Sequence, residues 1–199
     1  MDSTGFTIWL TGLPCSGKST IARKLARRLL ARGRRVEVLD GDLIRQSLSH
    51  GLGFSREDRD RNILRVAFVA NLLARNDVIV IVAVVSPYRA ARDEARRVLR
   101  RFFEVHVDCP LDECERRDVK GMYARARAGT LRGFTGVDDP YEVPLAAELS
   151  LSTSVQSSDE SAERVEAALV ESGHLSANDP SLGDSPELER RYSELFVWR

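Results

Sequence analysis

The chain has 199 residues, 43% of them hydrophobic and 30% charged, which suits one domain with a buried core. Basic and acidic residues both number 30, so the charge balance gives no reason to expect nucleic acid or an anionic membrane as a partner. No apolar run approaches the ~18 residues that cross a bilayer, and the first residues do not resemble a signal peptide. Cys15, Cys109 and Cys114 lack metal-site spacing, so we expect reduced thiols in a cytoplasmic protein.

The first elements alternate between strand and helix. FTIWL at 6–10 predicts a short buried strand, and the glycine-rich stretch GLPCSGKST at 12–20 follows it. Apolar residues on one face predict a helix over 19–32 that ends at Gly33. VEVLD at 36–40 predicts a second strand, followed by a turn and a short helix. Ser55 with Asp58 is typical of a capping box, which opens a helix through about Ala74.

The same alternation continues through the second half of the chain. DVIVIVAVVS at 77–86 is continuously apolar, as expected of a central parallel strand covered on both faces. Further helices are predicted over 89–101, 110–118 and 158–171, and further strands over 102–108 and 148–154. The pattern predicts an α/β protein of the three-layer P-loop NTPase type, with a central, mostly parallel sheet.

Two segments break this pattern. Residues 119–144 are rich in glycine, proline and charge, and they are long for a loop, so they predict a lid over a functional site. From Ser176 to Arg199 the composition turns polar, with two prolines and a glycine. We therefore expect one folded domain over 1–175, with the lid at about 119–144, and a poorly ordered polar tail over 176–199.

The glycine-rich stretch matches the P-loop pattern, Gly12 and then Gly17-Lys18-Ser19 after four intervening residues, between a strand and a helix. Such a loop turns its backbone amides toward phosphates, its lysine adds charge, and its serine hydroxyl ligates Mg²⁺. We expect Cys15 to be a loop filler rather than a nucleophile. The predicted ATP-binding residues are Gly12, Leu13, Pro14, Cys15, Ser16, Gly17, Lys18, Ser19 and Thr20.

Asp40 and Asp42 follow the second strand, at the edge where open α/β sheets bind ligands. Asp40 is predicted to order Mg²⁺ or to accept a proton from an attacking hydroxyl. Asp42 either contacts substrate or caps the next helix. Lys120 is one of three lysines in the chain and lies in the predicted lid, so we expect it to contact phosphate when the lid closes.

The chain resembles the adenylylsulfate (APS) kinase family. The resemblance rests on IWLTGLPCSGKST, VLDGD, GLGFSREDRDRNILRVAFVANLLA, VSPYRAARD, EVHVDCPLDECERRDVKGMYARARAG and GFTGVDDPYEVP, in the family order over roughly 6–144. It implies phosphoryl transfer from ATP, with Mg²⁺, to the ribose 3′-hydroxyl of APS, which gives 3′-phosphoadenylylsulfate (PAPS). It also implies a homodimer as one possibility. Leu43 stands where the family usually has asparagine, which leaves a somewhat altered acceptor open.

The resemblance also implies roles for individual residues. Arg45, Arg59 and Asn62 would hold the phosphosulfate and the nucleotide. Phe54 and Phe134 would enclose the adenine of APS; both lie in glycine-flanked loops, which makes core burial the weaker interpretation. Ser86 corresponds to a serine described in the family as phosphorylated, although it could instead bond substrate or cap the following helix.

Two other functions remain open at this level. The same fold could phosphorylate another small-molecule hydroxyl, such as one on a sugar or an antibiotic. The chain could also be a nucleotide-gated regulatory protein, although such a protein needs loops that sense the γ-phosphate rather than a carboxylate aimed at an acceptor.

Overall fold

The computed structural model describes residues 4–99, 101–179 and 185–196. Its centre is one sheet of five parallel strands in the order β2-β3-β1-β4-β5. This confirms the predicted parallel α/β fold. The strands are β1 (Phe6–Thr11), β2 (Val36–Asp40), β3 (Ile79–Ala83), β4 (Phe102–Asp108) and β5 (Leu149–Ser152).

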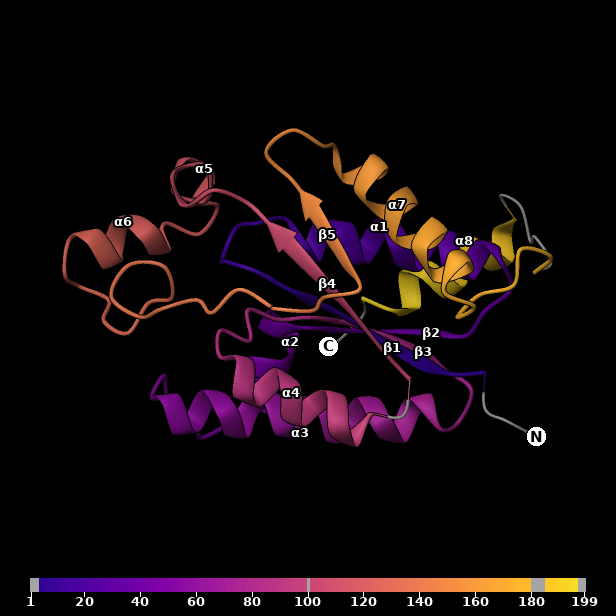
Figure 1. Cartoon of the computed structure of the whole chain (residues 1–199), viewed down its shortest axis with the longest axis horizontal. Coiled ribbons are helices and arrows are strands. Elements are labelled where there is room, and N and C mark those ends of the chain that lie inside the picture. The colour runs from indigo at the N-terminus through magenta and orange to yellow at the C-terminus, as the bar shows by residue number, and fades with distance from the viewer. Residues whose placement is uncertain (1–3, 100, 180–184, 197–199) are drawn as a thin grey trace.

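Helices cover both faces of the sheet and make three layers (Figure 1). One face carries α1 (Lys18–Ala31), α7 (Ser158–Glu171) and α8 (Pro186–Glu194), and the other carries α3 (Arg56–Ala74) and α4 (Arg89–Val98). Short helix α2 (Gly41–Gln46) follows β2 directly. Helices α5 (Leu111–Arg117) and α6 (Met122–Arg127) lie beyond the carboxyl ends of the strands. Within the described ranges, no helix is both long and apolar enough to span a bilayer.

Strand β3 shows why the sheet lies between two helical layers. Ile79, Ile81 and Ala83 face the core formed with α1 and α7, whereas Val80 and Val82 face the core formed with α3 and α4. All five side chains are at most 3% exposed. A strand that is apolar on both faces must be covered on both faces, because exposed apolar surface costs free energy.

Most predicted boundaries agree with the structure to within a few residues. Helix α7 spans the predicted residues and begins with a full capping box, Ser157 with Glu160. The box predicted at α3 is only half formed, because the Ser55 hydroxyl accepts the Asp58 amide but the Asp58 carboxylate accepts the Gly53 amide instead. The helix predicted over 89–101 ends at Val98, and residue 100 lies outside the described residues.

Part of the segment expected to be a poorly ordered tail forms a helix, α8, over residues 186–194. Ser185 caps α8 by accepting the Leu188 amide, and Pro186 occupies the first turn, where a missing amide hydrogen costs nothing. Leu188 is 1% exposed and Leu195 is 7% exposed, and both join the core beside α1. Residues 180–184 and 197–199 of the predicted tail lie outside the described residues.

Substitution of Leu188 tests whether α8 holds to the domain. Leu188→Ala should lower the free energy of unfolding by about 2–5 kcal/mol, because it removes a fully buried side chain and leaves a cavity. Urea denaturation measures the change. The control is Arg190→Ala on the exposed side of α8, whose ion pair with Glu194 is solvent-exposed and should contribute under ~0.5 kcal/mol. An unchanged midpoint for Leu188→Ala would show that α8 adds no stability.

Candidate active site

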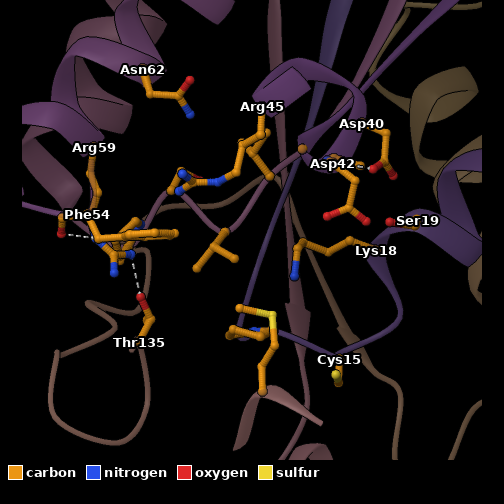
Figure 2. Close-up of a pocket in the computed structure, with 18 of the residues that line it drawn as sticks. Cys15, Lys18, Ser19, Asp40, Asp42, Arg45, Phe54, Arg59, Asn62 and Thr135 are labelled. Carbon is orange, nitrogen blue, oxygen red and sulfur yellow. Dashed lines mark hydrogen bonds between the residues drawn. The ribbon is translucent and has the colours of Figure 1, made fainter. Parts of the chain in front are cut away.

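A cavity of about 250 Å³ lies at the carboxyl edge of the sheet, between the P-loop, the ends of β2 and β3, helix α3 and the lid (Figure 2). Five of the predicted site residues do not line it: Gly12, Leu13, Ser16, Gly17 and Thr20. The predicted residues that do line it are Pro14, Cys15, Lys18, Ser19, Asp40, Asp42, Arg45, Phe54, Arg59, Asn62, Ser86, Lys120 and Phe134.

The P-loop owes its course to two glycines. A Cβ on Gly12 would lie 2.5 Å from the Val107 carbonyl oxygen, so only glycine allows this approach to β4. Gly17 precedes α1 with a φ of 104°, in the region that favours glycine. These constraints explain why a glycine stands at each end of the loop.

The outer side of the P-loop is held by groups that do not line the cavity. The carbonyl oxygens of Pro14 and Ser16 accept hydrogen bonds from the Tyr123 hydroxyl, at 3.0 Å, and the Thr153 hydroxyl, at 2.8 Å. Arg117 donates to the Cys15 carbonyl at 3.4 Å. The loop is therefore fixed by the lid helix α6, helix α5 and the turn after β5.

Lys18 is the buried cation of the loop. Its ammonium group donates to the carbonyl oxygens of Gly12, at 3.0 Å, and Leu13, at 2.6 Å. Burial lowers the pKa of Lys18 to about 8, and nearby groups that include the Asp40 carboxylate offset only part of this shift. A lysine in this state gains much from an incoming anion, because a negative charge at the cavity favours the protonated form.

Asp40, at the end of β2, caps the next helix, which was one of the two roles predicted for Asp42. The Asp40 carboxylate accepts the Asp42 amide at 3.0 Å and so caps α2, while its second oxygen is not part of this bond. Asp42 is exposed in the first turn of α2 and forms an ion pair with Lys120 of the lid. Both carboxylates thus line the cavity beside Lys18 (Figure 2).

Arg59, on α3, connects the two loops that carry the predicted aromatic contacts. Its guanidinium donates to the Phe54 carbonyl at 3.0 Å, to the Thr135 hydroxyl at 2.7 Å and to the Gly133 carbonyl. The residue is 8% exposed. Because the donors point in fixed directions from one plane, this side chain sets the distance between the GLGFS loop and the lid.

Phe54 forms the open side of the cavity. It is 47% exposed, and the Arg45 guanidinium lies 4.3 Å from its ring centroid. The Arg59 guanidinium lies 5.9 Å from the same centroid, and burial together with the charge of Arg59 lowers the pKa of Arg45. Asn62 also lines the cavity, and its side-chain oxygen accepts a hydrogen bond from the Ser49 hydroxyl. This side of the cavity suits an anion joined to a flat ring.

Phe134 corrects the expectation that both loop phenylalanines avoid core burial. It is 7% exposed and packs edge-to-face on Tyr123, with ring centroids 4.9 Å apart. The two rings belong to a small apolar cluster with Cys109 and Cys114 under the lid. Phe134 thus lines the cavity and also stabilises the lid, so the lid has a core of its own.

Ser86 has a buried hydroxyl that is engaged inside the protein. It accepts from the Trp9 indole at 3.1 Å and donates to the Thr11 hydroxyl at 2.9 Å, and the residue is 2% exposed. Arg92 bonds the Ser86 carbonyl at 2.6 Å. Ser86 does not cap α4, because the residue at that position is Tyr88. This geometry favours a role in holding the loop after β3 over a role as phosphate acceptor.

Comparison with known proteins places these features in one family. The family model described as adenylylsulphate kinase matches residues 4–152. The chain belongs to the adenylylsulphate kinase family. It is 53% identical to the adenylyl-sulfate kinases of Picosynechococcus sp. and Rippkaea orientalis over 88% of this chain and 99% and 97% of theirs. The Mycobacterium tuberculosis APS kinase solved with AMPPNP and APS has a TM-score of 0.81 at 45% identity, over 84% of this chain and 98% of that one.

Some residues that line the cavity were not predicted from the sequence. Another residue, suspected of altering the acceptor, does not line it. Met122 and Thr135 line it from the lid, and Ile63 lines it from α3. Thr135 directly follows Phe134 in the family stretch GFTGVDDPYEVP, and this position could have identified it as a site residue. Leu43, which departs from the usual family residue, is not part of the lining, although its neighbour Asp42 is. The departure therefore lies outside the acceptor side of the cavity.

The buried Lys18 generates a pH dependence of stability. Its pKa is lowered to about 8 in the folded chain from an unfolded value of 10.5, so between these values the unfolded chain binds more protons. The stability of wild type relative to Lys18→Met should therefore be flat below about pH 8 and rise from there to pH 10, by at most ~1.4 kcal/mol per pH unit.

Urea denaturation of both proteins at pH 7, 8, 9 and 10 measures this difference. Lys24→Met removes an exposed ammonium from the same helix and should keep the wild-type trend. Parallel curves for wild type and Lys18→Met over the whole range would show that Lys18 is not buried as a shifted cation.

Proposed function

We propose that this protein transfers the γ-phosphoryl group of ATP to the ribose 3′-hydroxyl of APS, giving PAPS. The observation that carries the proposal is the shared cavity: Lys18 and Asp40 line the same space as Phe54, Arg45 and Arg59. The first pair suits phosphates and an attacking hydroxyl, and the second group suits an anionic nucleotide. The family membership and the M. tuberculosis structure with AMPPNP and APS support the same assignment.

On the ATP side, the reaction requires positioning and charge neutralisation more than covalent chemistry. The P-loop amides would hold the phosphates of ATP, and the Lys18 ammonium would exchange its carbonyl partners for phosphate oxygens. Burial favours this exchange: Lys18 is 7% exposed, and opposite charges attract each other more strongly where little water screens them. Asp40 would accept the proton of the 3′-hydroxyl during attack.

Mg²⁺ fits the donor set of the cavity. In the described part of the chain, no group of three or more His, Cys, Asp or Glu forms a metal site. However, Mg²⁺ bound to nucleotide phosphates needs only one or two protein oxygens and keeps its waters. The Ser19 hydroxyl and the Asp40 carboxylate are such oxygens, and both line the cavity. When bound, the ion would neutralise charge on the phosphates.

On the acceptor side, we propose that Phe54 and Phe134 stack on the adenine of APS while Arg45, Arg59 and Asn62 hold its phosphosulfate. Lys120 would add charge from the lid once its ion pair with Asp42 opens. The apolar cluster of Phe134 and Tyr123 would help exclude water, which protects ATP from hydrolysis.

The direct test is PAPS formation by the purified protein with ATP, Mg²⁺ and APS, resolved by chromatography. Product from wild type and none from Lys18→Ala would support the proposal. A folded protein that binds ATP but makes no PAPS would contradict the acceptor, and a screen of sugars and other hydroxyl compounds would follow. ATP binding without any acceptor-dependent turnover would favour the regulatory alternative.

Asp40→Asn separates the catalytic role of Asp40 from its role as a helix cap. Asparagine also caps helices well, so folding should be preserved. We expect kcat to fall ~10²-fold or more, because the side chain can no longer accept a proton. Steady-state kinetics measures this, with Asp93→Asn on the exposed side of α4 as the matched control.

Titration with Mg²⁺ then distinguishes the two roles proposed for Asp40. If the carboxylate acts by ordering the ion, excess Mg²⁺ should restore part of the lost activity of Asp40→Asn. If it acts as the base, excess Mg²⁺ should restore none. Near-normal turnover of the variant at ordinary Mg²⁺ would contradict both roles.

Phe54→Ala tests the stacking contact. Because Phe54 is 47% exposed, its loss should change stability little. We expect KM for APS to rise about fivefold or more, since base stacking on an aromatic side chain is worth ~1–3 kcal/mol. KM for ATP should change less than twofold. Phe68→Ala, at an exposed phenylalanine on α3, is the control, and equal effects on both substrates would argue against stacking.

We also propose that the protein works in a reducing compartment such as the cytoplasm. All three cysteines are free thiols, and two of them, Cys109 and Cys114, are buried under the lid. The homodimer implied by the resemblance stays a prediction, which light scattering of the purified protein would test.

A further inference from the structure

Tyr88 and Asp139 join the segment after β3 to the lid without lining the cavity. Tyr88 is 3% exposed, and its hydroxyl donates to one Asp139 carboxylate oxygen at 2.7 Å. The other Asp139 oxygen accepts from the Thr135 hydroxyl at 3.4 Å and lies 3.9 Å from the Arg59 guanidinium. A continuous series of polar contacts therefore runs from the start of α4 to Arg59.

Asp139 also closes the loop that presents Phe134. The Asp139 carbonyl accepts the Gly136 amide at 2.8 Å, and the Asp139 amide donates to the Phe134 carbonyl at 3.3 Å. The neighbouring Asp138 carboxylate accepts the Gly133 and Phe134 amides at 2.8 and 2.6 Å. The loop is thus a closed turn, and the Tyr88 hydroxyl bonds the end of that turn.

Among the described residues, the Tyr88 hydroxyl has Asp139 as its one hydrogen-bond partner. Tyr88 occupies the N-cap position of α4, yet its side chain does not cap the helix. The Arg56 guanidinium lies 4.3 Å from its ring centroid. Burial and the hydrogen bond to Asp139 raise the pKa of Tyr88 to about 12, so the hydroxyl stays a donor at neutral pH.

We propose that Tyr88 and Asp139 are positioning residues that set Arg59 and Phe134 in place for the acceptor, and this rests on the proposed function. Neither residue touches the cavity, so both must act through the residues that do. Arg59 already connects the Phe54 loop to the lid through its other donors. The Tyr88 hydroxyl therefore sets the relative position of the two loops that would enclose APS.

Tyr88→Phe is the first test, because it removes one hydroxyl and keeps the buried ring. We expect KM for APS to rise about fivefold to tenfold, as for one lost hydrogen bond, with kcat and KM for ATP changed less than twofold. Tyr192→Phe on α8 is the matched control. Lower stability or less active protein with an unchanged KM for APS would overturn the proposal, since that is the outcome of a purely structural role.

A double-substitution cycle tests whether the two residues act together. Asp139→Ala and Tyr88→Phe/Asp139→Ala should have the same KM for APS, because the hydroxyl has nothing left to bond. Effects of the two substitutions that multiply would overturn the pairing.

Hydrogen exchange without substrate keeps this test separate from the proposed function. In Tyr88→Phe, the amides of 134–139 should exchange faster than in wild type, whereas those of α7 should not. If wild type makes no PAPS but amides 134–139 exchange faster in Tyr88→Phe, the APS assignment is contradicted, whereas the positioning role of Tyr88 and Asp139 is supported. If wild type makes PAPS and Tyr88→Phe leaves both the KM for APS and the exchange of 134–139 unchanged, the positioning role is contradicted, whereas the APS assignment is supported.

Discussion

The burial of β1 and β3 on both faces is the constraint on which the rest of the structure depends. Trp9 faces one helical layer while Ile8 and Leu10 face the other, and all three are fully buried. An unpaired charged side chain inside such strands would cost much free energy, so charged groups gather where the strands end. Parallel strands all end at one edge, and that edge holds Lys18, Asp40 and the cavity. The position of the site is thus a consequence of the core.

Two buried arginines near this edge are tolerated because each has several partners. Arg92 is 2% exposed, and its guanidinium lies 3.0 Å from the Glu104 carboxylate and bonds the carbonyls of Ser86 and Glu142. Arg59 is satisfied in the same way by groups of the lid. Lys18 differs, because the described groups that bond its ammonium are neutral oxygens. Burial therefore lowers its pKa with little compensation, and an anionic ligand would favour its charged form.

The elements that could be predicted are those encoded locally. The continuous apolar run gave β3, the capping residue Ser55 gave the start of α3, and the P-loop pattern gave the turn before α1. The features that could not be predicted depend on contacts between distant parts of the chain. The burial of Phe134 depends on Tyr123, the fixed hydroxyl of Ser86 depends on Trp9, and the short, mostly polar helix α8 depends on the burial of Leu188 in the core beside α1. Thirteen of the predicted site residues do line the cavity, although their roles remain proposals.

One side of the cavity is held by the sheet and α1, and the other side is held by loops. This difference explains how one fold can be adapted to different acceptors. The side with Lys18, Ser19 and Asp40 lies on the first residues of α1 and the last residue of β2, so its geometry is tied to the sheet. The side with Phe54 and Phe134 lies on loops that hydrogen bonds and a small separate cluster hold in place. Substitution in those loops can change what is bound without disturbing the main core. The residues proposed to hold phosphate are therefore positioned by the fold, whereas those proposed to bind the acceptor are positioned by a few polar contacts between loops.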